Sequence, residues 1–304
     1  MEVFEKIKNP QAWRQLTIAI VGGDDREQEI ARLAGESGAQ VRAFGFPWPE
    51  GGIANVMLAE SAAEALRDAD IALMPIPGIA SDGSIFATEK IIPDETLLSG
   101  MADGAHIILG EADDNLGTAA EALGITLHEY ESDQELMLLR APAIVEAAIK
   151  IIIENTRITI HQSPVCVVGQ GNIGTVLTRT LVALGAQVTV AARNPVQRAY
   201  AYTLGARGIT LEELPEQAGQ FPIILSTVPA PIVTSEVIDN LPADALVMDL
   251  SAPPGGVDLK HAEATGRTAI WARALGRRAP ITVGASQWSG ILKIINRIIS
   301  ESNQ

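Results

Sequence analysis

Residues 165–174 read Val-Cys-Val-Val-Gly-Gln-Gly-Asn-Ile-Gly, and this stretch decides the fold of the second half of the chain. An apolar run, Val165–Val168, leads directly into a G-x-G-x-x-G pattern that begins at Gly169. An amphipathic segment follows, and then a second apolar run, Val188–Ala192. The glycine pattern alone is weak evidence. Placed between a strand and a helix within about 30 residues, it predicts a Rossmann dinucleotide-binding unit.

Each glycine of the pattern has a separate physical task. Gly169 allows the tight turn, Gly171 lets a pyrophosphate approach the backbone, and Gly174 lets the helix pack closely on the strand. The helix then offers free N–H groups and a partial positive charge to the anion. The cofactor-binding residues predicted from this loop are Gly169, Gln170, Gly171, Asn172, Ile173 and Gly174.

The end of the second strand of this unit indicates which cofactor is bound. An NAD site usually has an acidic residue there, which holds the ribose 2′-hydroxyl. This chain instead has Ala192-Arg193-Asn194 and no acid. A guanidinium matches a 2′-phosphate in charge and geometry, so the sequence predicts NADP rather than NAD. The alternative is that Arg193 is a solvated residue at the end of a strand.

Composition limits the classes of function. The chain has 304 residues, enough for two domains, and 47% of them are hydrophobic with only 4% aromatic, as in α/β proteins with parallel sheets. The net charge of −15 argues against nucleic acid or an anionic membrane as a partner. A single cysteine, Cys166, in a chain with no apolar run of membrane-spanning length fits a cytoplasmic protein. No Cys/His cluster with metal-ligand spacing is present, so no metal is expected.

The N-terminal segment Thr17–Phe44 repeats the theme of strand, glycines, helix and strand. The two units even share a short sequence, because Leu184-Gly-Ala-Gln-Val188 corresponds to Ser37-Gly-Ala-Gln-Val41. The sequence therefore predicts an α/β protein of two doubly wound domains with mostly parallel sheets, the second being the Rossmann domain.

The first unit has lost the dinucleotide pattern. Gly22-Gly23 is followed by Asp24-Asp25-Arg26, which places charged side chains where a pyrophosphate would lie. Two interpretations of this turn stay open. Arg26 and the helix N-terminus hold a small anion, or the aspartates only cap the helix and Arg26 pairs locally.

The remaining elements are expected from short apolar runs and turn residues. A long helix from Ser132 to about Glu154, with Ser132 as N-cap, Glu135 completing a capping box and Pro142 kinking or breaking it, is the expected connector. We expect a flavodoxin-like domain over residues 1–150, completed by a helix within 286–304, and the NADP-binding domain over 151–285. The other strands expected are Ile71–Met74, Ile107–Leu109, Thr126–His128, Ile223–Ser226, Leu246–Asp249 and Thr268–Trp271. The other helices expected are Ala62–Leu66, Asp94–Met101, Leu116–Leu123, Pro195–Thr203 and Trp288–Ile299, with an irregular loop before the last.

With these motifs in order, the chain resembles the dipicolinate synthase A subunit family of spore-forming bacteria over nearly its whole length. The motifs that carry the resemblance are Gly22-Gly-Asp-Asp-Arg26, Pro75-Ile-Pro77 with Asp82-Gly83, Thr159-Ile-His161, Ala191-Ala-Arg193, Thr227-Val-Pro229, Asp249-Leu-Ser with Gly255-Gly-Val-Asp258, and Ala279-Pro280 with Gly284.

Two stretches depart from the family. On the connector, the family's asparagine–alanine–isoleucine–proline–threonine–alanine–glutamate–glycine stretch is replaced by residues 140–147, in which Glu146 is retained and Ile144 stands for the threonine. In the last loop, Ile281 replaces the family's lysine. In the family both stretches face the interdomain cleft, so these changes bear on the substrate and not on the cofactor.

The resemblance implies an NADP-dependent oxidoreductase that forms dipicolinate from dihydrodipicolinate, or from its hydrated precursor, in the interdomain cleft, on a sporulation branch of lysine biosynthesis. It also implies a flavoprotein-like second subunit, the B subunit, and we expect a homo-oligomer. The candidate catalytic residues are Arg26 and Arg140, as cations for a dicarboxylate, and Asp249, which is otherwise a local cap. Strand-end residues expected to complete the cofactor site are Thr227, Val228, Pro229 and Ser251. The alternatives are a related NADP-dependent dehydrogenase of another small carboxylic acid, or a non-catalytic NADP-binding subunit.

Overall fold

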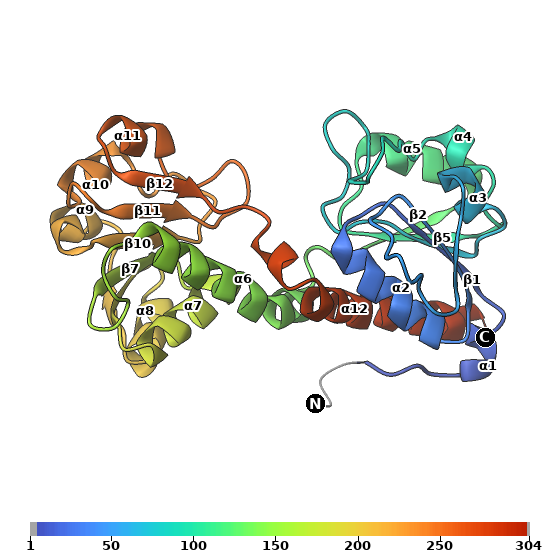
Figure 1. The fold of residues 1–304 in the computed structure, drawn as a ribbon, viewed down its shortest axis with the longest axis horizontal. Helices are drawn as coiled ribbons and strands as arrows, with labels where there is room; N and C mark the ends of the chain where they lie inside the picture. The colour runs from blue at the N-terminus through green and yellow to red at the C-terminus, as the bar shows by residue number, and fades with distance from the viewer. Residues whose placement is uncertain (1–4, 303–304) are drawn as a thin grey trace. The chain divides into compact units, whose positions relative to one another are not determined.

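A computed structural model describes residues 5–302 of the chain (Figure 1). The chain folds as two compact units. Of the described residues, unit 1 contains 5–140 and 279–302, and unit 2 contains Ala141–Arg278. The chain therefore leaves unit 1 once and returns to it at its end.

Unit 1 is built on a six-stranded sheet in the order β3-β2-β1-β4-β5-β6, with every neighbouring pair parallel. This is the dinucleotide-binding order and not the flavodoxin-like order expected from the sequence, because β3 lies outside β2 at the edge and β1 pairs directly with β4. The strands are β1 Thr17–Val21, β2 Gln40–Phe44, β3 Val56–Leu58, β4 Ile71–Leu73, β5 His106–Leu109 and β6 Thr126–Glu129.

Helices cover both faces of this sheet (Figure 1). One core lies between the sheet and helices α2 and α12, and includes Trp13, Ile30 and Ile295. The other lies between the opposite face and α3, α4 and α5, and includes Leu66, Leu98 and Leu116. The helices of this unit are α1 Pro10–Trp13, α2 Asp25–Glu36, α3 Ala62–Leu66, α4 Glu95–Leu98, α5 Asp114–Leu123 and α12 Pro280–Ser302.

Unit 2 repeats the same wiring, with a sheet in the order β12-β11-β10-β7-β8-β9 and all pairs parallel. Its two cores lie under α6 (Gln134–Asn155), α7 and α8 on one face and under α9, α10 and α11 on the other. The strands are β7 Pro164–Val168, β8 Gln187–Ala191, β9 Arg207–Ile209, β10 Ile223–Ser226, β11 Leu246–Asp249 and β12 Thr268–Trp271. The helices are α7 Asn172–Ala183, α8 Pro195–Thr203, α9 Leu214–Gln217, η1 Ala218–Gln220, α10 Ser235–Asn240, α11 Leu259–Ala264 and η2 Leu275–Arg278. The predicted α/β fold of two doubly wound sheets is confirmed.

The connector is the single helix α6, Gln134–Asn155, which runs through Pro142 without a break. Its N-cap is Asp133 and not Ser132, because the Asp133 carboxylate accepts hydrogen bonds from the amides of Glu135 and Leu136, at 2.8 and 3.1 Å. None of the helices within residues 5–302 is both long enough and apolar enough to cross a membrane.

Helix α12 begins at Pro280, well before the expected start at Trp288, so the segment expected to be irregular is partly helical. Proline suits the first turn of a helix because its missing N–H has no partner there in any case. The helix packs on α2 at Gly284, where an added Cβ would lie 2.6 Å from the Arg26 carbonyl oxygen and 2.8 Å from the Glu29 Cβ. At Gly290 a Cβ would meet only Tyr130, at an ordinary 3.7 Å.

We expect Gly284→Ala and Gly290→Ala to change stability in opposite directions. Both add a methyl group to α12, but at Gly284 it collides with backbone and costs about 1–3 kcal/mol. At Gly290 it fits, and the better helix propensity of alanine adds up to about 1 kcal/mol. Urea unfolding followed by circular dichroism measures both. Equal effects of the two variants would contradict the packing described for α12 on α2.

Candidate functional site

The glycine loop after β7 is held in shape by the end of β10. Gly169 has a φ of +93°, and an added Cβ would lie 2.7 Å from Thr227 Oγ1 and 2.5 Å from Val228 Cγ2. A Cβ at Gly174 would collide with the carbonyl group of Gly169. Thr227 Oγ1 also donates to the Val168 carbonyl at 3.0 Å, which ties the two central strands together at their carboxyl ends.

Gly171, by contrast, faces open space, with no atom within 4 Å of an added Cβ. It is the N-cap of α7, and no side chain caps the first amides of that helix. These amides have no intrahelical acceptors, so they are available to an anion. Next to them, Gln170 accepts a hydrogen bond from Thr178 through Oε1 at 2.9 Å, while its buried Nε2 has no partner within residues 5–302. Open space and an unused amide donor fit a dinucleotide pyrophosphate at this loop.

The residues after β8 present a cation on the same edge of the sheet. Arg193 is exposed and forms no ion pair within residues 5–302, and no acid stands beside it in the sequence. Arg198, on α8, donates through Nη1 to the carbonyls of Ala192 and Arg193 at 2.6 and 2.8 Å, so it holds the backbone that carries Arg193. Asn194 caps α8 by accepting from the Val196 amide at 2.8 Å. The sequence reasoning missed Arg198, whose only signal was its place in the first turns of the helix after Arg193.

Asp249, at the end of β11, organises the loop that follows it. The buried carboxylate accepts from the Ser251 amide and hydroxyl at 2.9 and 2.6 Å and from the Gly256 amide at 2.7 Å. Both carboxylate oxygens of Asp249 thus accept hydrogen bonds from the loop that follows β11, as expected if Asp249 is a local cap. Ser251 in turn uses its hydroxyl on Asp249, so its predicted cofactor contact stays a prediction.

The corresponding turn in unit 1 is closed. Where unit 2 has an open glycine, unit 1 has Asp24, whose side chain accepts from the Arg26 amide at 3.1 Å and caps α2. Glu27 completes a capping box, accepting from the Asp24 amide at 2.6 Å. The amide of Gly23 donates to the Phe86 carbonyl at 2.6 Å. The expectation that charged side chains fill this turn is confirmed, and these side chains leave no room for a pyrophosphate.

Arg26 adopts the local pairing that the sequence left as one of two alternatives. Its Nε and Nη2 donate to the two carboxylate oxygens of Asp24 at 2.8 and 3.0 Å, and the side chain is buried. Most of the charge of this guanidinium is therefore balanced within unit 1. A role for it with substrate stays a prediction.

Arg140 lies in the same unit and shares a neighbour with Arg26. Its Nη2 donates to Glu131 at 2.9 Å, whereas its buried Nε has no hydrogen-bond partner within the described residues. Burial first, and then the nearby Glu27, raise the pKa of Tyr130, while Arg26 and Arg140 oppose that rise. Both arginines therefore act electrostatically on the Tyr130 phenol. The third predicted catalytic residue, Asp249, belongs to unit 2.

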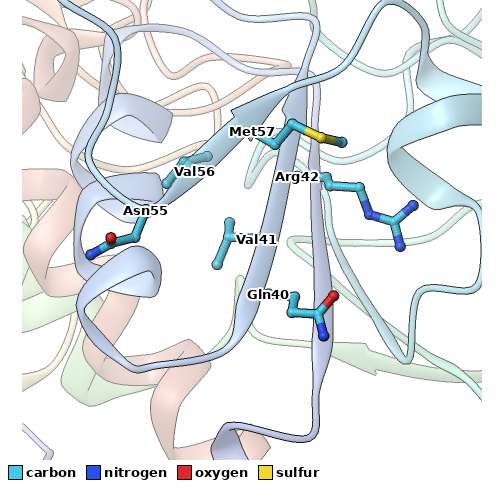
Figure 2. A pocket seen from close by; sticks show the side chains of 6 residues that line it. All are labelled: Gln40, Val41, Arg42, Asn55, Val56 and Met57. Carbon is cyan, nitrogen blue, oxygen red and sulfur yellow. The ribbon is translucent and has the colours of Figure 1, made fainter.

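Unit 1 also has a pocket on its edge strands, separate from the turn after β1 (Figure 2). Its lining residues belong to β2 and β3 and the residue before β3, not to the carboxyl ends of the central strands. Arg42 is its one charged residue, and its Nη1 already donates to the Glu64 carbonyl at 3.1 Å. No group of three or more metal-ligating side chains occurs within the described part of the chain. The pocket residues are Gln40, Val41, Arg42, Asn55, Val56 and Met57.

Sequence comparison finds known proteins that are similar to each of the two units. Residues 17–131 match the N-terminal domain of the dipicolinate synthase A subunit, and residues 151–267 match shikimate/quinate 5-dehydrogenase. The dipicolinate synthase A subunit of Bacillus subtilis (strain 168) is 29% identical over 95% of this chain and 99% of its own length. This chain is a relative of the dipicolinate synthase A subunit. Unit 2 is a dehydrogenase-type Rossmann domain, as the sequence predicted.

Two crystal structures of dipicolinate synthase A subunits extend the similarity to three dimensions. The protein from Bacillus subtilis has a TM-score of 0.84 at 28% identity, covering 94% of this chain and 97% of its own. The protein from Bacillus halodurans has a TM-score of 0.83 at 26% identity, covering 91% of this chain and 96% of its own. The resemblance identified from the motifs is confirmed. With the match of unit 2 to a dehydrogenase, it supports an NAD(P)-dependent dehydrogenase.

Glu27 is a buried titratable group beside Arg26 that the sequence reasoning missed. Its carboxyl group fills the space where a Cβ at Gly23 would lie, so glycine is required there. Burial, the largest effect, raises the pKa of Glu27 to about 7 against the nearby charge of Arg26, which lowers it. Folding therefore favours the protonated form of Glu27 relative to the unfolded chain.

We expect Glu27→Gln to gain stability over wild type as the pH rises from 5 to 8. A carboxyl whose pKa is raised by folding stabilises the protein below its unfolded pKa and loses that contribution as the pH passes through the folded value. Glutamine keeps the capping box and cannot ionise. One pKa unit is worth about 1.4 kcal/mol, so the melting temperatures should diverge by several degrees.

The matched control is Glu36→Gln, an exposed carboxyl on the same helix. Differential scanning fluorimetry across the pH range compares the three proteins. A constant difference between Glu27→Gln and wild type at all pH values would show that Glu27 does not titrate in this range.

Proposed function

We propose that this chain is an NADP-dependent oxidoreductase that converts dihydrodipicolinate, or its hydrated precursor, into dipicolinate. The observation that carries the proposal is the uncapped N-terminus of α7 at Gly171, in a chain related throughout its length to the dipicolinate synthase A subunit. The first supports dinucleotide binding, and the second supports this substrate class.

Unit 2 provides the groups that would hold the cofactor. The first amides of α7 and the Gln170 Nε2 would bind the pyrophosphate, and Arg193 would bind the 2′-phosphate. Arg198 acts indirectly, because its two hydrogen bonds fix the backbone at Arg193. When bound, the oxidised nicotinamide supplies a hydride acceptor.

Aromatisation of the substrate ring makes hydride departure favourable, so the protein's main task is to align the substrate and exclude water. A dicarboxylate requires cations or hydrogen-bond donors. Arg140 meets this requirement better than Arg26, because its Nε has no partner among the described residues and its carboxylate partner Glu131 is partly exposed. Arg26 already donates to Asp24 through both its Nε and its Nη2.

A second protein is part of the proposal. The name of the Bacillus subtilis relative denotes one subunit of a synthase. We propose that this chain likewise works with a B subunit of flavoprotein-like character, and that it self-associates. Size-exclusion chromatography with light scattering, on this chain alone and mixed with its partner, measures both.

We expect Arg193→Ala to weaken NADPH binding by roughly ten- to a hundredfold and to leave NADH binding unchanged, because one charge-assisted contact is worth about 1.5–3 kcal/mol. Isothermal titration calorimetry with both coenzymes measures the change. Arg157→Ala, which changes an exposed arginine that precedes the first residue of β7, serves as the control. Equal affinity of wild type for NADPH and NADH would contradict the assignment of NADP.

The reaction itself is tested by NADPH formation from a dihydrodipicolinate-generating system. We expect wild type to produce NADPH and Gly171→Ala to lose most of this activity while keeping its melting temperature, because the added Cβ meets no protein atom but stands where the pyrophosphate approaches. Gly117→Ala, an equally open glycine in α5, is the control and should remain active. Tight NADPH binding without turnover of this substrate would refute dipicolinate formation and leave the other two alternatives.

A further inference from the structure

Gln287, in α12, carries a buried side-chain amide with no hydrogen bond. The residue is fully buried, and neither its Nε2 nor its Oε1 has a partner within residues 5–302. Folded proteins satisfy nearly all buried polar side-chain atoms, so an amide with both ends unused requires an explanation. Neighbouring Ser286, equally buried, does have a partner and donates to the Val283 carbonyl at 2.7 Å.

The position of Gln287 on α12 shows what it faces. Residues three apart lie on one face of a helix, so Gln287 lies between Gly284 and Gly290. Gly284 packs on the Arg26 backbone, and Gly290 packs on the Tyr130 ring. A helical side chain leans toward the N-terminus of its helix, which directs the Gln287 amide to the region between Tyr130 and the start of α2.

That region holds both predicted substrate cations. The Arg26 backbone packs against Gly284, and Arg140 donates to Glu131, the residue that follows Tyr130. Arg140 adds a second unused donor, because its buried Nε also has no partner within the described residues. The unused groups here are thus two donors and one acceptor, all from unit 1.

Gln170 offers a comparison within the same chain. It too is a buried glutamine with an unused Nε2, and it lies in the loop that the glycine pattern assigns to the dinucleotide. The proposed function therefore assigns a ligand to its unused atom. Gln287 has the same property in unit 1, where the capping of α2 by Asp24 excludes a dinucleotide from the turn.

We propose that Gln287 is a substrate-recognition residue, whose amide acts together with the Arg140 Nε to bind a carboxylate-bearing heterocycle in unit 1. This inference rests on the proposed function. The amide N–H of Gln287 suits a carboxylate oxygen, and its amide oxygen suits a ring N–H. Arg140 supplies a positive charge, because the charge of Arg26 is already paired with Asp24. Because the amide is closed off from solvent here, its neighbours move when the ligand enters.

The test compares Gln287→Met with Ser286→Ala. Methionine has nearly the same shape and removes both polar atoms, whereas Ser286→Ala removes a buried hydroxyl that already has a partner. Calorimetric titration of the full chain with pyridine-2,6-dicarboxylate, with and without NADPH, measures recognition. Thermal unfolding without ligand measures the cost of the unused amide.

We expect Gln287→Met to weaken dicarboxylate binding by roughly ten- to a hundredfold, with NADPH affinity unchanged and the melting temperature equal or higher. Ser286→Ala should bind the dicarboxylate as wild type does. Wild-type dicarboxylate affinity in Gln287→Met overturns the inference. A lower melting temperature in the same variant would then indicate a water molecule bonded to the buried amide. Absence of dicarboxylate binding in wild type overturns the proposed substrate as well, so the two failures are distinguishable.

Discussion

The hydrogen bond from the Gly23 amide to the Phe86 carbonyl closes, in unit 1, the turn that unit 2 leaves open at Gly171. Both units have the same strand order, and in both a helix begins directly after the first central strand. In unit 1, Asp24 and Glu27 satisfy the first amides of that helix, whereas in unit 2 no side chain does so. Because a helix N-terminus without a cap requires an anion or water, one fold yields one turn suited to a dinucleotide and one that is not.

The rest of the proposed site follows from this difference. The cation after β8, fixed by Arg198, belongs to the open unit, where a 2′-phosphate would require it. In the closed unit, Arg26 and Arg140 both act electrostatically on the buried Tyr130 phenol. The Arg26 guanidinium is paired with Asp24 through Nε and Nη2, so we assign the proposed recognition of an anionic substrate to groups with unused hydrogen-bonding atoms. The proposed function thus assigns the cofactor to unit 2 and the substrate-binding groups to unit 1.

Central elements were predictable from sequence because fully buried strands and amphipathic helices leave strong patterns. The strands Ile223–Ser226 and Leu246–Asp249 lie where their apolar runs predicted. The three-residue edge strands β3 and β9 were missed, since short and partly exposed strands have little apolar periodicity. The choice between the two roles of Arg26 depended on side-chain pairing that the local sequence does not encode. No sequence pattern marked Gln287, because a glutamine in an apolar helix is expected to be exposed until its burial is known.

Hydrogen exchange measured by mass spectrometry with and without NADPH tests the central claim most directly, because it follows both turns in one experiment. The account predicts that NADPH slows exchange in peptides covering residues 169–176 of unit 2 and leaves peptides covering residues 22–29 of unit 1 unchanged. Slowed exchange at the unit 1 turn, or no change at the unit 2 loop with saturating NADPH, would contradict it.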